Sequence, residues 1–428
     1  MGIPKAEKKR RRSRTEMEVE MISTETIPPS SPTPTHHPLS FLDQMAPPIY
    51  STLILYFPPP PPHCNPIPTL KSSLSKALSL FYPLSGRLCH PLSPDIHIDC
   101  TPPCGVTFVE AQTPNLFSDF IAESPLEDLV SLLPCHPFSV RSDSVACVQA
   151  THFGCGAIAL AVCAAHKVVD AASLASFILT WSRISRGDLP SSSPTFDSHA
   201  IFPPQDMTCL DSDCTPKQNP AQPLVTHVFV FEPQTIKSLK ASCMVPGIVP
   251  TTVEAVSVLI WRSISKDGQP YGLMHIVNIR QALEPPLPKG SFGNVVLGTF
   301  AEDRSGSGGN EELVRAAIRS VDKEYVKKVR GRPMGLVESM ARMMELWRDE
   351  GTAFVRLTSW YRFPIYGNDL GWGRPVWASP GGACMPGVVK LMPTRDTGGV
   401  EMWVTLPRQD MDRFQRCPQI SAYCSRRF

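Results

Sequence analysis

The sequence has no apolar run long enough to cross a bilayer. The longest one, Ala157 to Ala165, falls far short of the roughly 20 residues that a transmembrane helix needs. Nor does an apolar segment of the signal-peptide kind follow the basic stretch near the start. These absences predict a protein that does not span a membrane, and we expect it in the cytoplasm.

The 14 cysteines include no Cys-x-x-Cys pair. Cys100–Cys104 and Cys209–Cys214 have neither a second pair nor a nearby His at the spacing of zinc ligands. We therefore expect no metal site. Without a secretory signal, the cysteines are predicted to be reduced thiols.

The charge is nearly balanced, with a formal net charge of +2. No global field favours nucleic acid or a membrane surface, so we expect neither as a partner. We also expect a monomer whose partners are small molecules. The one dense basic run, Lys8 to Arg14, could be a nuclear signal, an anchor for an anionic surface or part of a disordered leader. The composition changes at Met17. This change favours a disordered basic leader that comprises residues 1–16.

Strand and helix patterns alternate in both halves of the chain, which indicates the α/β class. A length of 428 residues exceeds what one core usually holds and predicts two domains. The segment 187–223 is rich in Pro and Ser, so we divide the chain into an N-terminal domain (17–200), a crossover loop (201–224) and a C-terminal domain (225–428). The main predicted helices are Thr69–Phe81, Ala171–Arg186, Thr252–Ser265, Glu311–Val329 and Gln409–Arg416, and the main strands are Ile49–Phe57, Val145–His152, Ala157–Ala165, Val225–Phe231, Leu273–Asn278 and a hairpin of Val388–Met392 with Val400–Leu406.

A candidate catalytic group stands where the apolar strand Ala157–Ala165 gives way to a helix: His166-Lys167-Val168-Val169-Asp170. Histidine can be neutral and basic near pH 7, as a general base must be. The His-x-x-x-Asp spacing alone arises by chance in roughly half of comparable sequences. A structural imidazole with no catalytic role therefore stays open beside the catalytic interpretation.

A rival motif precedes this histidine. Gly154-Cys155-Gly156-Ala157-Ile158-Ala159 matches the dinucleotide fingerprint G-x-G-x-x-A, which would indicate an oxidoreductase. The fingerprint requires a full helix after the glycines, and too few residues remain before His166. We interpret the glycines as a bend between two strands. The chain also lacks the Gly-x-Ser-x-Gly elbow of α/β-hydrolases.

Short blocks stand in order along the chain: Phe41-Leu42-Asp43, Tyr82-Pro83-Leu84-Ser85-Gly86-Arg87, His166 to Asp170, Asn278-Ile279-Arg280, Ser291-Phe292-Gly293-Asn294 and Asp369-Leu370-Gly371-Trp372-Gly373. In content and order they resemble the plant BAHD acyltransferases, and together they are far more specific than any one alone. The opening Met17-Glu18-Val19-Glu20 with Pro32-Thr33-Pro34-Thr35 is most similar to the vinorine-synthase-like branch of that family.

The resemblance implies a fold and an activity. The fold would be two similar-sized mixed-sheet domains of the chloramphenicol-acetyltransferase type with a central solvent tunnel. The activity would be acyl transfer, with acetyl-CoA the expected donor, to a hydroxyl of a plant specialised metabolite such as an alkaloid, terpenoid or phenolic. Acyl-CoA would be a co-substrate, with no permanently bound cofactor. A non-catalytic relative that partners another acyl-metabolising enzyme is the alternative, and the intact His166 and Asp170 speak against it.

Residue roles are implied in the same way. His166 would be the general base in the tunnel. Asp170 would orient its loop, held against Arg280. Asp369, which is often named beside the histidine as essential, would be mainly architectural. The remaining residues of its block are Leu370, where the family usually has Phe, and Gly371, Trp372 and Gly373.

Contacts to coenzyme A are predicted at the end of the helix Thr252–Ser265. Arg262, Ser263 and Lys266 offer cations and a hydroxyl to the phosphates and pantetheine. The alternative is a solvated helix end whose cations offset the helix dipole.

Overall fold

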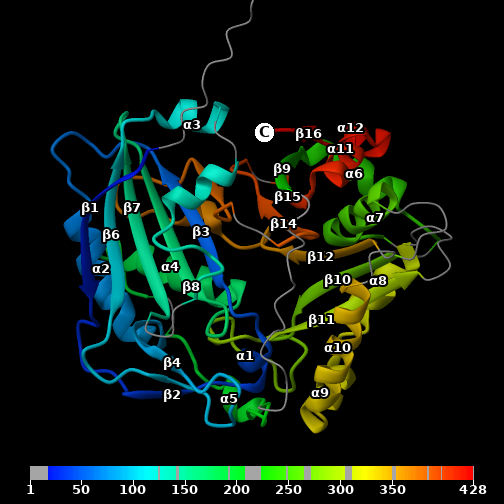
Figure 1. Ribbon diagram of the computed structural model, residues 1–428, viewed down its shortest axis with the longest axis horizontal. Helices are drawn as coiled ribbons and strands as arrows, with labels where there is room; N and C mark the ends of the chain where they lie inside the picture. The colour runs from blue at the N-terminus through cyan, green and yellow to red at the C-terminus, as the bar shows by residue number, and fades with distance from the viewer. Residues whose placement is uncertain are drawn as a thin grey trace, which may run out of the picture.

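The computed structural model describes residues 18–123, 126–140, 144–190, 193–207, 223–246, 249–264, 271–303, 311–348, 353–382, 385–396 and 398–427. Two mixed β-sheets lie side by side and carry the helices on their faces (Figure 1). The predicted leader 1–16 and most of the predicted crossover loop lie outside the described residues. Among the helices of the described part, none is long and apolar enough to span a bilayer.

The first sheet has the order β1-β6-β7-β8-β3-β13. Helices α2 and α4 pack against each other behind it in the view of Figure 1. All eight residues of β3 and of β8 are buried, because these central strands are covered on both faces and read as continuous apolar runs. The elements are β1 (Glu20–Ile27), β6 (Val106–Thr113), β7 (Ala146–Phe153), β8 (Ile158–Ala165), β3 (Tyr50–Phe57), β13 (Trp377–Ser379), α2 (Ile67–Leu80) and α4 (Ala171–Ser185).

The second sheet has the order β11-β10-β12-β14-β15-β9-β16. Helix α7 is central to its helical layer and contacts α6, α8, α11 and α12. The elements are β9 (Leu224–Phe231), β10 (Tyr271–Asn278), β11 (Val296–Asp303), β12 (Ala353–Ser359), β14 (Val388–Pro393), β15 (Val400–Pro407), β16 (Ser425–Arg426), α6 (Pro233–Ser242), α7 (Thr252–Ile264), α8 (Glu311–Arg319), α9 (Lys323–Gly331), α10 (Met334–Arg348), α11 (Arg408–Arg416) and α12 (Pro418–Tyr423).

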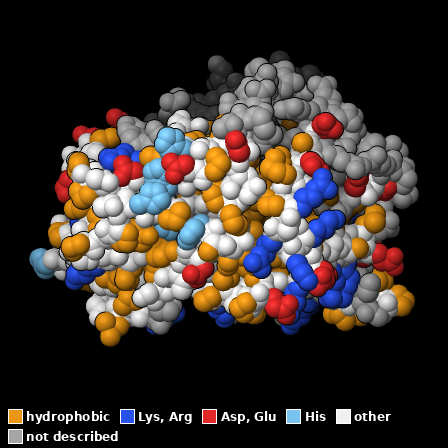
Figure 2. All heavy atoms as spheres, turned by 90° about the horizontal axis from the view of Figure 1, so that it is seen from below, with side chains coloured by type: hydrophobic (Ala, Val, Ile, Leu, Met, Phe, Trp, Pro, Cys, Tyr) orange, Lys and Arg blue, Asp and Glu red, His pale blue; other side chains and the backbone are white. Residues whose placement is uncertain are grey.

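A third, small sheet lies at the lower edge of the first in Figure 1, in the order β2-β5-β4. Seen from below, histidines gather on its side of the molecule, and Lys and Arg gather on the other side, toward α9 (Figure 2). The rings of His36 and His97 stack with their centroids 4.4 Å apart. The remaining elements are β2 (His36–Pro38), β4 (Arg87–Cys89), β5 (His97–Asp99), α1 (Phe41–Met45), α3 (Phe117–Glu123), α5 (Ser198–Ile201) and the 3-10 turns η1 (Tyr82–Ser85), η2 (Leu126–Leu132) and η3 (Ile365–Gly367).

The two sheets do not divide cleanly along the sequence. Strand β13 comes from the second half of the chain but pairs with β3 of the first sheet. Its Trp377 stacks on Trp403 of β15 at 6.0 Å. This exchanged strand, which the sequence did not predict, joins the two sheets.

Most predicted elements are confirmed within a few residues, and two outcomes matter for the interpretation. Strands β7 and β8 form an antiparallel hairpin whose turn includes Gly156, with φ +83°. The predicted bend between two strands is therefore confirmed, and the rival dinucleotide-binding interpretation is wrong because no helix follows the glycines. The predicted helix Glu311–Val329 is wrong as a single helix. It breaks into α8 and α9 because the Asp322 side chain caps a new N-terminus by accepting a hydrogen bond from the Tyr325 amide.

Candidate active site

His166 follows the last residue of β8, and its backbone is fixed on both sides. Its amide donates to the Ile49 carbonyl at 2.8 Å. Its carbonyl accepts from Nδ2 of Asn294 at 2.7 Å. The side chain is half-buried, and its buried Nδ1 has no hydrogen-bond partner among the described residues. The imidazole is thus held by its backbone while that ring nitrogen stays free.

Burial lowers the pKa of His166 below its ordinary value, because an imidazolium is poorly solvated in this position. The negative charge of Asp170 opposes the shift, and the positive charge of Lys390 adds to it. The net result is a lowered pKa, so the ring is neutral at pH 7. A neutral imidazole is the form that can accept a proton.

Asp170 is buried and has both carboxylate oxygens occupied. It is the N-cap of α4, with Oδ1 accepting from the Ser173 amide at 2.8 Å. Arg280 donates to Oδ2 at 2.7 Å and to Oδ1 at 3.1 Å, and the Val295 amide donates to Oδ2 at 3.1 Å. Burial alone would raise the pKa of this carboxyl, but Arg280 and the amides outweigh it and hold the pKa below its usual value.

Arg280 carries this bond network into the segment 291–294. Arg280 is 3% exposed, and its guanidinium also donates to the carbonyls of Ser291 and Gly293. Gly293 has φ +110°, and a Cβ there would lie 2.8 Å from Oγ of Ser198. Only glycine fits this close approach, which explains the glycine of the Ser-Phe-Gly-Asn block.

A second buried carboxylate, Asp43 of α1, holds Asn294 in turn. Its Oδ1 accepts from the amide and from Nδ2 of Asn294, both at 2.8 Å. Its Oδ2 accepts from the amide and Oγ of Ser40 at 2.7 and 2.6 Å. Burial raises the pKa of Asp43, and these hydrogen bonds only partly oppose it. The sequence marked Phe41-Leu42-Asp43 as family-like but gave Asp43 no role.

Lys167, next to His166, binds the segment that follows Asp43. Its ammonium donates to the carbonyls of Gln44 and Ala46 at 2.8 and 3.0 Å, just after Asp43. Segments 40–46, 166–173, 278–280 and 291–295 thus meet in one polar network. This network contains His166, Asp170 and Arg280 of the predicted site.

The block of Asp369 lies elsewhere. Oδ1 of Asp369 accepts from the amides of Gly371 and Gly373 at 2.9 and 3.2 Å, and the Leu370 carbonyl accepts from Oγ of Ser185 at 2.7 Å. Ser185 is the last residue of α4, a helix of 15 residues that spans about 22 Å from its N-cap, Asp170. Asp369 therefore closes its own loop at the far end of that helix. Leu370 is 1% exposed in the core of the first sheet, and the ring of Trp372 packs on Phe57.

Comparison with known proteins decides the family. Residues 17–420 match the model of the Transferase family. The chain is 33% identical to epi-neemfruitin B synthase L1AT of Melia azedarach, over 96% of this chain and 99% of that one. It is 32% identical to a limonoid 21-O-acetyltransferase of the same plant, with the same coverage. The chain belongs to this transferase family, the BAHD acyltransferases. It is an acyltransferase that moves groups other than aminoacyl groups.

Solved structures confirm the fold of this BAHD acyltransferase. Vinorine synthase superposes with a TM-score of 0.80 at 28% identity, covering 96% of this chain and all of that one. TRI101 of F. sporotrichioides, solved with coenzyme A and T-2, superposes with a TM-score of 0.70 at 18% identity, covering 92% of this chain. The predicted class, two mixed-sheet α/β domains of the chloramphenicol-acetyltransferase type, is therefore confirmed.

The predicted coenzyme A contacts lie at the end of α7. Arg262 pairs with Glu311 at the start of α8. Ser263 is 8% exposed and donates its hydroxyl to the Leu259 carbonyl at 2.7 Å, so that donor is already used. Lys266 lies outside the described residues. Arg262 is thus the better placed of the two described groups, and the contact remains a prediction.

Among the described residues, two groups of side chains have atoms placed closely enough to hold a metal ion, and neither includes His166. One comprises Cys135, Cys147 and Cys163, and the other His36, Asp95 and His97. In each group the ligand atoms lie within 4.8 Å of one another. Neither group shares a residue with the polar network around the histidine.

Proposed function

We propose that this BAHD acyltransferase moves an acetyl group from acetyl-CoA to a hydroxyl of a plant specialised metabolite, with His166 as general base. One observation carries the proposal. His166 is a half-buried imidazole with a lowered pKa and a ring nitrogen that has no partner in the described structure, and its backbone is clamped by Ile49 and Asn294. Nδ1 of His199, His227 and His275 also lacks a partner among the described residues, so the free nitrogen alone does not single out His166. What distinguishes His166 is that its carbonyl is held by Asn294, in the same network as Asp170 and Arg280.

In the proposed reaction His166 takes the proton of the acceptor hydroxyl as its oxygen attacks the thioester carbonyl. The tetrahedral intermediate then expels coenzyme A, and the imidazolium returns the proton to the leaving sulfur. Proton transfer of this kind contributes about 10²–10⁴-fold to the rate. Asp170 acts as a positioning residue in this scheme, because Arg280 and two amides occupy its oxygens. We propose that both substrates reach His166 through a tunnel between the sheets.

The names of several relatives support an oxygen atom as the acceptor. Two of them are named as O-acetyltransferases of limonoids, from Melia azedarach and Citrus sinensis, at 32% identity. Another is named stemmadenine O-acetyltransferase of Catharanthus roseus, at 29% identity. We infer a hydroxylated terpenoid as the first acceptor class to examine and an alkaloid alcohol as the second.

The test is a transfer assay with labelled acetyl-CoA and panels of limonoid and alkaloid alcohols, read by mass spectrometry of the product and by release of free CoA. His166→Ala should abolish product formation without loss of fold. A matched control is His152→Ala, since His152 is a half-buried histidine of the adjacent strand β7 that pairs with Glu110. Acetylation of amines but not alcohols would contradict the O-transfer proposal. Absence of turnover with every donor and acceptor would favour a non-catalytic partner role.

A further inference from the structure

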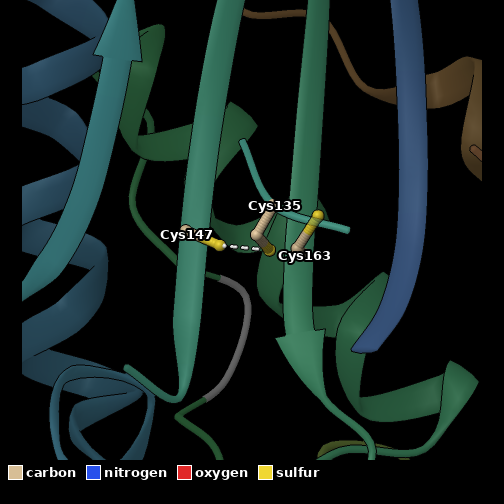
Figure 3. A group of neighbouring side chains, drawn as sticks. All are labelled: Cys135, Cys147 and Cys163. Atoms are coloured by element: carbon tan, nitrogen blue, oxygen red, sulfur yellow. Dashed lines mark hydrogen bonds between the residues drawn. The ribbon is translucent and has the colours of Figure 1, made fainter. Parts of the chain in front are cut away.

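Three cysteine side chains converge on one face of the first sheet, outside the network of His166 (Figure 3). Cys147 of β7 and Cys163 of β8 stand directly opposite each other in the antiparallel ladder. Cys135 reaches them from the loop that follows η2. The sulfurs of Cys135 and Cys147 lie 3.0 Å apart, and all three lie within 4.8 Å.

The three thiols differ in access. Cys147 and Cys163 are 5% and 0% exposed, whereas Cys135 is half-buried. An oxidant in solution therefore meets Cys135 first. The thiol nearest to it is that of Cys147, and a disulfide needs the two sulfurs to approach from 3.0 Å to about 2.05 Å. Rotation of side chains can supply a movement of this size.

The surroundings favour a neutral product over a metal thiolate. Burial raises the pKa of the Cys163 thiol, so this side chain resists ionisation. Three thiolates around a monovalent or divalent ion would carry a net negative charge, and the cluster lies within the apolar core of the first sheet. A disulfide carries no charge and meets no such penalty.

We propose that Cys135 and Cys147 form a modification site, at which a hydroperoxide converts the two thiols to a disulfide. The Cys135 thiol gives up its proton to solvent, its sulfur attacks one peroxide oxygen and forms an S–O bond, and the O–O bond breaks; the leaving oxygen takes a proton from solvent and departs as an alcohol or water. The Cys147 sulfur then attacks the sulfenic acid, the S–S bond forms, the S–O bond breaks, and a water leaves. Two thiols are oxidised and one hydroperoxide is reduced. The site does not depend on acyl transfer.

The cross-link would tie a segment that borders the histidine. Pro137, two residues after Cys135, accepts from the Tyr50 amide at 2.8 Å. The neighbouring Ile49 carbonyl accepts from the amide of His166. Oxidation therefore fastens the Cys135 loop to β7 beside the chain that positions the catalytic histidine.

The test uses the full chain, treated with hydrogen peroxide under native conditions, alkylated and digested with chymotrypsin. Cleavage after Phe138, Phe153 and Leu160 places Cys135, Cys147 and Cys163 on separate peptides. We expect a cross-linked pair carrying Cys135 and Cys147, lighter by two hydrogen atoms than the two reduced peptides together, and lost on treatment with dithiothreitol.

Variants make the result decisive. Cys135→Ser should remove the cross-linked pair, and since Cys135 is only half-buried this variant is expected to fold. The control Cys155→Ser, at an exposed thiol in the β7–β8 turn, should leave the pair intact. Oxidation of Cys135 to its sulfonic acid without cross-linking would overturn the proposal. So would cross-linking of Cys135 to Cys155, or one tightly bound metal ion per purified chain that Cys135→Ser removes.

Discussion

The buried pair of Asp170 and Arg280 provides the strongest prediction about how the site is held. We consider Asp170→Asn, which keeps the shape of the side chain but removes its charge. Asparagine is as good an N-cap as aspartate, so the start of α4 should survive. The variant keeps Arg280, which is 3% exposed, but removes the negative charge that pairs with its guanidinium.

The expected loss of unfolding free energy follows from the burial of Arg280. Removing one partner of a buried ion pair costs about 3–5 kcal/mol, because the other charge is left uncompensated. The carbonyls of Ser291 and Gly293 still accept from Arg280, which places the expected loss near the lower end, about 3 kcal/mol. Asp99→Asn is the matched control. One contact of 2.8 Å joins Arg87 to Asp99, whereas two join Arg280 to Asp170. Because the Arg87–Asp99 pair is exposed and screened by solvent, the expected loss is much smaller than for Asp170→Asn.

Urea unfolding monitored by circular dichroism measures both losses. Small proteins reach m-values of about 3 kcal/mol/M in urea and m rises with size, so the midpoint for Asp170→Asn should fall by at most about 1 M. Adding Arg280→Met to this variant should cost less than the sum of the two single changes, since it removes the orphaned charge. A loss below about 1 kcal/mol for Asp170→Asn, or strict additivity in the double variant, would refute the account of the pair.

Three further outcomes are expected. The acid limb of the kcat/KM profile should lie below pH 6.5, because burial lowers the pKa of His166 and keeps the base neutral there; a limb above 6.5 would contradict this. Asn294→Ala removes the donor to the His166 carbonyl and should lower kcat about tenfold with little change in KM for acetyl-CoA, whereas a change confined to KM would argue against a positioning role. Leu370→Ala should cost about 2–5 kcal/mol in unfolding free energy while leaving KM unchanged, because the side chain is buried at the far end of α4; a KM shift above threefold would show that this loop reaches the substrate.

The elements around the histidine were predictable because their patterns are local. Strand β8 is an unbroken apolar run, and α4 carries Phe177 and Trp181 on one buried face. The break between α8 and α9 was missed, because a single capping side chain, Asp322, outweighs a continuous helical pattern. The exchange of β13 was also missed. It depends on pairing with β3, more than 300 residues earlier in the chain, and no local signal encodes it.

The candidate site, like the fold, could be predicted from the sequence only in part. His166, Asp170 and Arg280 were identified by resemblance, and the structure brings them into one network. The bond from Asn294 to the histidine carbonyl depends on Asp43, which lies 251 positions away in sequence, so spacing could not predict it. Nor could the sequence pattern show that the hydroxyl of Ser263 donates to the Leu259 carbonyl of its own helix.

The central claim is that the imidazole of His166 removes the acceptor proton. The most direct measurement is the rate of CoA release from acetyl-CoA with an acceptor alcohol, compared between the wild type and His166→Ala at equal folded concentration. The account predicts a fall of about 10²–10⁴-fold in His166→Ala, with His152→Ala close to the wild type. A rate for His166→Ala within tenfold of the wild type would contradict it.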